Sequence, residues 1–406
     1  MVKVVFLHPD LGIGGAERLV VDAAVALHTR GHEVYMVTNH HDPDHCFEET
    51  RNAIPVTVVG DWLPRSVFGM FFALCAYIRM IYAALYLNYF SNLNPDVVFC
   101  DQISACIPVL HLRFDKVLFY CHFPDFLQSK ETGVLKKLYR APLNWLEEVT
   151  TRSSNVILVN SKFTAGVFRR TFTSISTVPG VLYPSINTDA FDDAIVRPIK
   201  DIVSMDLPQQ STIFLSINRY ERKKNLGLAL QALSELQSML KPQVYNNVYL
   251  IMAGGYDRRI QENVDYFADL VVKAGQLNIS HKVIFLKSPS GPDKHSLLFG
   301  MDCLLYTPTN EHFGIVPLEA MYAGKPVIAI NSGGPTETVV HGETGLLVNE
   351  DPVHFAEAMA RIVNNRKEKE NFGFKGKKRF VSNFSFTAFS NQLESTILDL
   401  VQGRNQ

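Results

Sequence analysis

The sequence has no appreciable excess of charge of either sign. Its 406 residues include 39 basic and 40 acidic side chains, which gives a formal net charge of −1. This balance argues against a broad nucleic-acid surface, so any anionic partner must be bound locally. The six cysteines show no paired spacing and mostly lie in apolar runs. We therefore expect buried free thiols in a reducing compartment.

The sequence also lacks a signal peptide pattern, an internal repeat and any low-complexity segment. The apolar part of the opening MVKVVFLHPD is too short and too soon interrupted for a signal peptide, and it reads as a first strand. With 47% hydrophobic residues the chain is a folded protein. A chain of this length is too long for one ordinary core, so two domains are expected.

Short apolar runs alternate with helical patterns, which predicts an α/β fold of two Rossmann-like, doubly wound domains. The first covers 1–183, a proline-, aspartate- and serine-rich linker covers 184–210, and the second covers 211–384. We expect a last amphipathic helix, within 385–406, to pack back on the first domain. The expected strands lie at 2–8, 96–100, 116–121 and 155–159, and then at 212–217, 249–253, 282–286, 303–306 and 327–330.

The longest apolar stretch is 68–90, with Arg79 as its single charge. It is long enough to cross a bilayer. A central arginine is costly there, and the strand pattern resumes at 96. A helix in the membrane interface, an ordinary core helix and a span stay open as alternatives. The basic cluster Lys136, Lys137 and Arg140 suits a helix on anionic headgroups, or equally a solvated helix face.

Two features of the first domain are candidate ligand sites. Gly12 and Gly14 match the start of a dinucleotide fingerprint, but Glu17 replaces its third glycine, which argues against an oxidoreductase. Gly14 and Gly15 still allow a backbone to approach a ligand, although a plain tight turn would look the same. His122 follows an expected strand, and the carboxyl ends of strands carry ligands in such sheets. A histidine that only caps the next turn is the alternative.

The second domain contains Glu311 and Glu319, eight residues apart across an expected loop-to-helix junction. Pro317 suits the first helical position and Gly324 the residue past the helix end, so Glu319 is expected in the first turn. Free N–H groups near the helix start would point toward an anion. The glycine turn SGGPTE at 332–337 is expected to shape the same site.

A cationic segment follows the expected strand 212–217. Arg219 and Lys224, with Arg222 and Lys223 between them, are suited to bind a diphosphate, because guanidinium clamps it and ammonium supplies a mobile charge. A solvated charge run is the alternative. Carboxylates do not favour a diphosphate, so we expect Glu311 and Glu319 to bind hydroxyl groups.

These motifs together resemble the retaining glycosyltransferases of family four, whose two Rossmann-like domains face each other across a cleft in the GT-B fold. The resemblance rests on the glutamate spacing, the cation pair, the glycines of the first turn and SGGPTE. The stretches FYCHFPD, LSINRYERKKNL and NEHFGIVPLEAM are more narrowly similar to the mannosyltransferases that extend dolichol-linked oligosaccharides. Nearly the whole chain is covered.

The resemblance implies a donor, GDP-mannose, bound by the second domain without a metal. Arg219 and Lys224 would contact the diphosphate, Glu319 the ribose and Glu311 the transferred mannose. Asn218 stands where many relatives have glycine, and its side chain would reach the donor. The implied catalytic residues are Glu311, His122, Arg219 and Lys224. The implied donor-binding residues are Gly14, Gly15, Asn218, Arg219, Lys224, Glu311, Phe313, Gly314, Ile315 and Glu319.

The implied acceptor is a dolichol-diphosphate-linked Man1GlcNAc2, extended through α-1,3 and α-1,6 bonds with retention at the cytosolic face of the endoplasmic reticulum membrane. The partners implied are the membrane surface and other early-pathway glycosyltransferases, and no nucleic acid. Asp42 and Asp44 form the one acidic pair that resembles a metal-binding motif, and we expect no metal there. Another donor, a soluble acceptor and a non-catalytic GT-B scaffold at the membrane stay open as alternatives.

Overall fold

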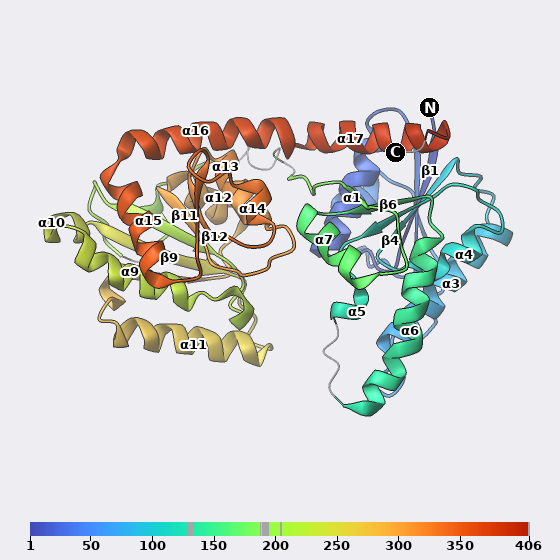
Figure 1. Ribbon diagram of the computed structural model, residues 1–406, viewed down its shortest axis with the longest axis horizontal. Helices are drawn as coiled ribbons and strands as arrows, with labels where there is room; N and C mark the ends of the chain where they lie inside the picture. The colour runs from blue at the N-terminus through green and yellow to red at the C-terminus, as the bar shows by residue number, and fades with distance from the viewer. Residues whose placement is uncertain (129–132, 187, 189–194, 204, 405–406) are drawn as a thin grey trace. The chain divides into compact units, whose positions relative to one another are not determined.

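The computed structural model describes residues 1–128, 133–186, 188, 195–203 and 205–404. The chain forms two compact units, one of Met1–Ser185 with Phe386–Gln406 and one of Ile186–Ser385. Each unit is a parallel sheet with helices on its faces, as Figure 1 shows. The α/β fold of two doubly wound units predicted from the sequence is confirmed. Part of the expected linker, 184–210, lies outside the described residues.

The sheet of the first unit has seven strands in the order β3-β2-β1-β4-β5-β6-β7, all paired in parallel. The strand order reverses between β1 and β4, which are neighbours. In doubly wound sheets ligands bind outside the carboxyl ends of the strands at such a switch point. The strands are β1 (Lys3–His8), β2 (Glu33–Thr38), β3 (Val56–Val58), β4 (Val97–Asp101), β5 (Val117–Cys121), β6 (Val156–Val159) and β7 (Gly180–Val181).

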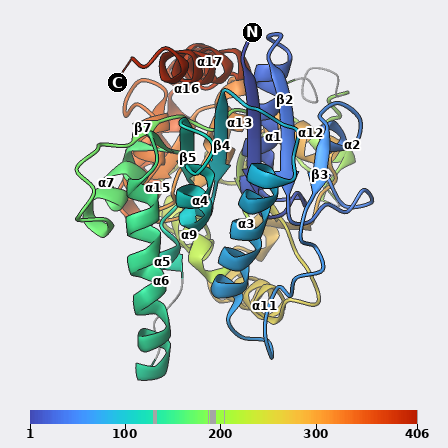
Figure 2. The same cartoon turned by 90° about the vertical axis from the view of Figure 1, so that its right-hand side faces the viewer.

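Helices cover both faces of this sheet because successive strand side chains alternate between two cores. Phe6 packs in the core beneath α1 and α17, while Val5 and Leu7 pack in the core beneath α3 and α4. Figure 2 shows α3 and α6 in front of the strands. The helices are α1 (Gly15–His28), α2 (Glu48–Asn52), α3 (Phe72–Tyr89), α4 (Ile107–Leu110), α5 (Asp125–Gln128), α6 (Val134–Arg152), α7 (Lys162–Thr171) and α17 (Phe386–Val401).

The last helix, α17, belongs to the first unit although it follows the whole of the second. Its apolar face buries Leu393 and Ile397 in the core shared with α1. Glu394 pairs with Arg30, and its other oxygen lies 3.0 Å from Nε2 of His32. The apolar face of α17, near the C-terminal end of the chain, is thus buried in the unit that contains the N-terminal strands.

We expect Leu393→Ala to destabilise the first unit by about 2–5 kcal/mol, because a fully buried leucine leaves a cavity when truncated. Leu138→Ala is the matched control, since the Leu138 side chain is exposed and its loss should change stability by less than about 0.5 kcal/mol. Urea denaturation followed by circular dichroism measures both. Equal stabilities of the two variants would contradict the packing of α17.

The sheet of the second unit has six parallel strands in the order β10-β9-β8-β11-β12-β13. Its switch point lies between β8 and β11. The expected strands at 212–217, 303–306 and 327–330 are confirmed at both ends. The strands are β8 (Thr212–Ile217), β9 (Val248–Gly254), β10 (Val283–Lys287), β11 (Cys303–Tyr306), β12 (Val327–Ile330) and β13 (Gly345–Val348).

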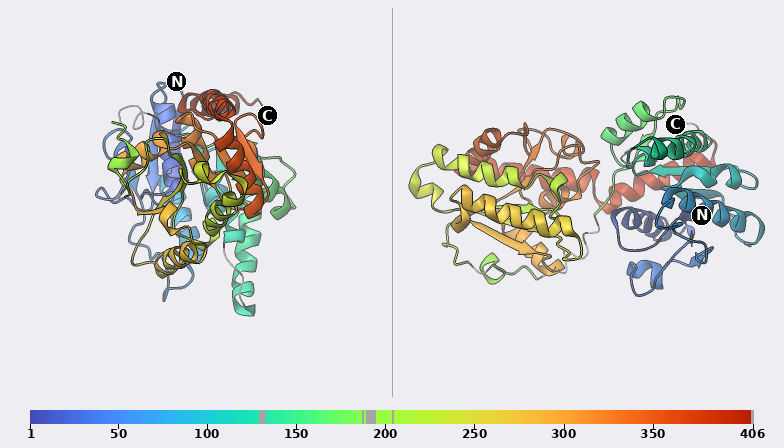
Figure 3. Two further views of the ribbon diagram at one scale, coloured as in Figure 1. Left: turned by 90° about the vertical axis from the view of Figure 1, so that its left-hand side faces the viewer. Right: turned by 90° about the horizontal axis from the view of Figure 1, so that it is seen from below.

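Both faces of this second sheet are covered as well. Helices α9, α11 and α15 share one core with the strands, and Figure 3 shows α9 and α11 side by side. Helices α12 and α13 pack together over the other face. The helices are α9 (Gly227–Met239), α10 (Pro242–Tyr245), α11 (Gln261–Gln276), α12 (Gly291–Gly300), α13 (Ile315–Tyr322), α14 (Pro335–Thr338), α15 (Pro352–Asn364) and α16 (Arg366–Asn383).

The apolar stretch 68–90 forms helix α3, which begins at Phe72 and ends at Tyr89. Its inner face buries Met80 and Leu87 in the core, and Arg79 donates a 2.9 Å hydrogen bond from Nη2 to the Asn39 carbonyl. Its outer face exposes apolar side chains, Phe72, Leu74, Ile78, Tyr82, Leu85 and Tyr89. Among the described residues α3 is the one helix that has the length and composition to cross a membrane.

Candidate functional site

The pairing of β8 with β11 brings together two distant loops of the second unit. Phe214 pairs with Cys303, so the segments that follow both strands leave the sheet at the same edge. There the Nζ of Lys224 lies 2.5 Å from Oε2 of Glu311. The Lys224 side chain is only 12% exposed, so this ion pair is largely withdrawn from water. Two residues predicted to bind one ligand are therefore direct neighbours.

Two further contacts fix this pair. Thr307, one residue past β11, donates a 2.8 Å hydrogen bond from its hydroxyl to the Lys224 carbonyl. The last residue of β11, Tyr306, is buried, and its hydroxyl hydrogen-bonds to Glu311. Burial, followed by the charge of Glu311, raises the pKa of Tyr306 well above its usual value, so Tyr306 stays a donor to the carboxylate. Glu311 is thus held by both a lysine and a tyrosine.

The SGGPTE turn at 332–337 packs against the loop that contains Glu311, so it shapes this site as the sequence predicts. The Gly334 N–H donates a 2.8 Å hydrogen bond to the Glu311 carbonyl. A Cβ on Gly334 would lie 2.0 Å from the Phe313 carbonyl oxygen, so no larger residue fits there. The ring of Phe313 is buried beside Phe384, with centroids 6.1 Å apart. Phe313 is therefore placed to offer a ligand its backbone only.

Helix α13 begins two residues earlier than expected. Gly314 has a φ of 86°, which favours glycine, and Ile315 is the first helical residue. The predictions that Pro317 opens the helix and that Glu319 lies in its first turn are therefore wrong. Gly324 does follow the helix end, with a φ of 70°, as predicted.

Glu319 projects from α13 into a buried position with one oxygen satisfied. Its Oε1 accepts a 2.7 Å hydrogen bond from Nζ of Lys294 on α12. Its Oε2 is buried and has no hydrogen-bond partner among the described residues, and the same holds for Nδ2 of Asn218. Buried polar atoms without partners are costly, so both atoms are suited to meet the hydroxyl or amide groups of a ligand.

The four cations after β8 do not act as one cluster. Arg219 is 63% exposed and pairs with Glu221, which also pairs with Lys223. Arg222 is exposed and pairs with Asp269. Lys224 alone of the four is turned inward. For Arg222 and Lys223 the alternative of a solvated charge run is therefore the correct one.

In the first unit, His122 lies beside a buried carboxylate at the switch point. Asp101, the last residue of β4, lies between His8 of β1 and His122 after β5. Its Oδ2 is 2.6 Å from Nδ1 of His8, and its Oδ1 is 2.9 Å from Nε2 of His122. The His122 carbonyl accepts a 2.9 Å hydrogen bond from Asn160. The backbone and the ring of His122 are thus both fixed, and the ring stays partly exposed.

The buried Asp101 stays ionised. Burial would raise its pKa, but the attraction of His122 and the hydrogen bonds of both imidazoles outweigh burial and lower the pKa to about 2. A carboxylate between two imidazoles fixes the orientation of both rings.

The predicted glycines of the first turn lie at the start of α1. Gly14 precedes the helix in an extended conformation, and Gly15 is its first residue. Neither has a positive φ, and a Cβ on Gly15 would meet no atom within 4 Å. The backbone at Gly15 is therefore open to a ligand, while its conformation alone does not require glycine.

Four residues of these two sites were not predicted from the sequence. Lys294 carries no motif, and it is found only through its contact with Glu319. Tyr306, His8 and Asp101 each end a strand of an expected pattern. These three could have been found from the sequence, because polar residues at the carboxyl ends of parallel strands gather at the ligand edge of the sheet.

The acidic pair at 42–44 forms a local turn in which the Asp44 N–H donates to the Asp42 side chain. In the part of the chain that the structure describes, no group of three or more histidine, cysteine, aspartate or glutamate side chains is arranged to hold a metal ion. All six cysteines are buried free thiols, as predicted.

We expect Asp101→Asn to lower the stability of the first unit most strongly near neutral pH. The lowered pKa means that ionised Asp101 stabilises the fold above about pH 4, by on the order of 2 kcal/mol, and that this is lost as the pH falls toward about 2. Unfolding free energies measured between pH 5 and 2 should converge for wild type and variant. Asp115→Asn, at an exposed position, is the control. A pH-independent difference would contradict the ionised carboxylate.

Two family models match the chain, one in each half. The family described as Glycosyltransferase Family 4 matches residues 13–190, and that described as Glycosyl transferases group 1 matches residues 199–379. Among solved structures, a sucrose-phosphate synthase from Thermosynechococcus elongatus has a TM-score of 0.75 at 19% identity, with 99% of this chain and 100% of that chain covered. A glycosyltransferase from Rickettsia africae has a TM-score of 0.75 at 17% identity, with 99% of both chains covered. The fold is that of the GT-B glycosyltransferases.

Curated relatives are similar over nearly their whole length. An alpha-1,3/1,6-mannosyltransferase ALG2 of Mus musculus is 52% identical, covering 98% of this chain and 96% of the relative. That of Saccharomyces cerevisiae is 39% identical, covering 97% and 84%. The chain is a glycosyltransferase, and it belongs to the alpha-1,3/1,6-mannosyltransferase ALG2 family.

Proposed function

We propose that this protein transfers mannose from GDP-mannose to a dolichol-diphosphate-linked Man1GlcNAc2, adding α-1,3 and α-1,6 mannoses with retention. Family membership supports the reaction class. The observation that carries the donor site is the inward-turned Lys224 paired with Glu311, at the same sheet edge as the unpartnered polar atoms of Glu319 and Asn218. A cation, a carboxylate and unsatisfied polar groups are what a sugar nucleotide requires.

In this proposal the donor's diphosphate takes Lys224 away from Glu311. Lys224 moves to a phosphate oxygen, and the exposed Arg219 turns from Glu221 to clamp the same group. Glu311, released from its lysine, accepts a hydrogen bond from a hydroxyl of the mannose. Glu319 binds the ribose through its free Oε2, and Asn218 meets the donor through Nδ2. The N–H groups of Phe313, Gly314 and Ile315 line the sugar and phosphate.

The chemical step follows from where charge develops. The leaving diphosphate gains negative charge, and Lys224, Arg219 and the start of α13 are positioned to stabilise it. In this proposal no metal is required for catalysis. No carboxylate is assigned as a nucleophile, so the acceptor hydroxyl attacks C1 of the mannose on the face from which the diphosphate leaves. The C1–O bond to the diphosphate breaks as the glycosidic bond forms, and the hydroxyl proton passes to an oxygen of the leaving phosphate, which gives retention.

The acceptor is assigned to the first unit. His122, fixed by Asp101, is positioned to orient an acceptor hydroxyl. The open backbone at Gly15 leaves room for a ligand. The apolar outer face of α3 suits the interface of a membrane, which favours a lipid-linked over a soluble acceptor. We assign the protein to the cytosolic face of the endoplasmic reticulum membrane, where other early-pathway glycosyltransferases are expected partners.

We expect Lys224→Ala to lower kcat by about a hundredfold, since losing one contact to developing charge costs about 3 kcal/mol. Lys223→Ala, one residue earlier and exposed, should stay within about twofold of wild type. Steady-state transfer to the lipid-linked acceptor measures both. Similar losses in the two variants would show that local charge, and not the position of Lys224, matters.

Substitutions of the two glutamates are expected to change different kinetic constants. Glu311→Gln should lower kcat with little change in the donor KM, because Glu311 faces the sugar that moves. Glu319→Gln should raise the donor KM about tenfold with kcat kept, because Glu319 only holds the nucleotide. Kinetics at varied GDP-mannose concentration separates the two effects. If Glu319→Gln lowers kcat instead, its assignment to the ribose is wrong.

The function itself is tested by incubating the protein with a panel of nucleotide sugars and a lipid-linked mannosyl-chitobiose, followed by mass spectrometry. We expect two hexoses to be added from GDP-mannose and none from the other donors. Addition from another donor, or addition to a soluble chitobiose at the same rate, would contradict the proposal.

A further inference from the structure

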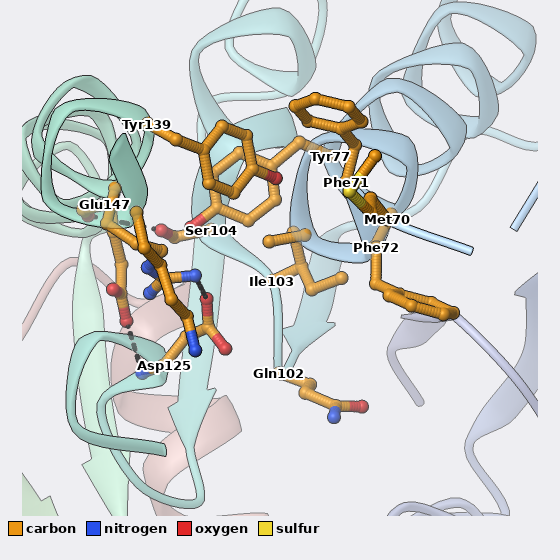
Figure 4. Close-up of a pocket in the computed structure, with 14 residues that line it drawn as sticks. Met70, Phe71, Phe72, Tyr77, Gln102, Ile103, Ser104, Asp125, Tyr139 and Glu147 are labelled. Atoms are coloured by element: carbon orange, nitrogen blue, oxygen red, sulfur yellow. Dashed lines mark hydrogen bonds and ion pairs between the residues drawn. The ribbon is translucent and has the colours of Figure 1, made fainter. Parts of the chain in front are cut away.

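The first unit contains a cavity of about 930 Å³ between α3, α6 and the segment after β4. Figure 4 shows aromatic side chains of α3 and α6, among them Tyr77 and Tyr139, on one side of it and the carboxylates of Asp125 and Glu147 on another. The Phe71 ring contacts the Tyr139 ring edge-on, with centroids 5.2 Å apart. Cavities of this size are typical of small-molecule ligand sites.

The polar end of the cavity holds an arginine that is not fully satisfied. Arg140 is 3% exposed, and its Nη1 donates a 3.0 Å hydrogen bond to Asp125. Its Nε and Nη2 are buried and have no hydrogen-bond partner among the described residues. Lys137 is exposed, whereas Arg140 is buried. The interpretation of Lys136, Lys137 and Arg140 as one solvated or membrane-facing basic face is therefore wrong for Arg140. Two buried guanidinium donors without acceptors point to an anionic ligand oxygen.

The neighbouring acidic groups leave these donors available. Glu147 accepts hydrogen bonds of 2.8 and 3.1 Å from the N–H groups of Asp125 and Phe126. Burial raises the pKa of Glu147 to about 7, so its negative charge is reduced near neutral pH. Asp125 is bound to the other nitrogen of Arg140. Lys136 also lines the cavity and adds a positive charge.

The cavity is bordered by exposed apolar side chains of α3 and of the segment just before it. Met70 and Phe72 line it and are exposed, and Phe68 nearby is 92% exposed. Phe71 has a φ of 60°, a conformation that is costly for a bulky residue, and its ring lies at the cavity. Such an apolar rim is suited to hydrocarbon and not to water.

The same cavity is continuous in sequence with the His122 site. Gln102 and Ile103, which line it, directly follow Asp101, the residue that holds His122. Asp125, at the polar end, lies three residues after His122 in the sequence. A ligand with its chain among the aromatic rings would therefore extend its polar head along the ligand edge of the sheet.

We propose that this cavity binds the lipid of the acceptor, with the first isoprene units of a polyisoprenyl diphosphate among the aromatic side chains and a phosphate oxygen on Nε and Nη2 of Arg140. The inference rests on the proposed function, because it names the subsite for the acceptor's lipid. It assigns to Arg140 a contact with the acceptor diphosphate, separate from the donor diphosphate on Lys224.

The first experiment measures binding of geranylgeranyl diphosphate to the full chain, without donor or transfer. Ala76 lines the cavity, whereas Ile78 on the same helix is exposed and does not. Ala76→Phe should weaken binding about tenfold, since each buried methylene is worth about fourfold in affinity, while Ile78→Phe should not. Arg140→Gln should weaken binding about tenfold, and its control, Lys137→Gln, by less than about twofold.

Equal binding of the probe by wild type and all variants would overturn the proposal. It would also be overturned if a diacyl phospholipid displaced the probe at the same concentration that a polyisoprenyl diphosphate requires. Thermal unfolding of each variant identifies any loss of folding. If Arg140→Gln unfolds, Ala76→Phe decides the outcome alone.

The second experiment measures transfer to two acceptors with the same sugar diphosphate and either a phytanyl or a short, water-soluble chain. Ala76→Phe should raise the KM for the phytanyl acceptor about tenfold, with kcat and the short-chain KM unchanged. An equal change for both acceptors would overturn the proposal. If the wild-type protein transfers no mannose but still binds the probe in a way that depends on Arg140 and Ala76, the proposed function is contradicted. The lipid site is then still supported.

Discussion

The parallel pairing of β8 with β11 is the constraint on which the candidate donor site depends. It brings Lys224 and Glu311, 87 residues apart in sequence, to a separation of 2.5 Å. A partly buried ion pair gains little by itself, because both charges lose water, so the surrounding contacts must hold it. The Thr307 hydroxyl and the glycine turn at Gly334 supply them. Strand pairing has the same effect in the first unit, where the neighbouring strands β1 and β4 bring His8 close to Asp101.

Two lysine–glutamate pairs give the candidate donor site its electrostatic character. Lys224 holds Glu311 and Lys294 holds Glu319, so each carboxylate is balanced by a cation from a different element. In the proposed complex, a diphosphate that displaces Glu311 from Lys224 would exchange one charge pair for another and would free a carboxylate for a sugar hydroxyl. The site is therefore balanced before the donor arrives. In the first unit, the carboxylate of Asp101 likewise lies between two side chains from different elements, His8 and His122.

Much of this organisation could be predicted from the sequence, because apolar runs that end in polar residues mark strands and their ligand edges. The bounds of β8, β11 and β12 follow from that pattern. The pairing of Lys294 with Glu319 could not be predicted, since it depends on how α12 packs on α13. The start of α13 was misplaced because Gly314, with its positive φ, sets it and Pro317 does not. Arg140 was assigned to the wrong environment because the packing of α6 on α5, and not local composition, buries it.

In the proposed donor complex, the diphosphate replaces Glu311 as the partner of Lys224. A crystal structure of the protein with GDP-mannose tests it most directly. We predict the diphosphate at the carboxyl edge of β8 and β11, with Nζ of Lys224 within hydrogen-bond distance of a phosphate oxygen and Glu311 turned to the mannose. A donor bound elsewhere, or a Lys224–Glu311 pair that persists unchanged beside the bound donor, would contradict the account.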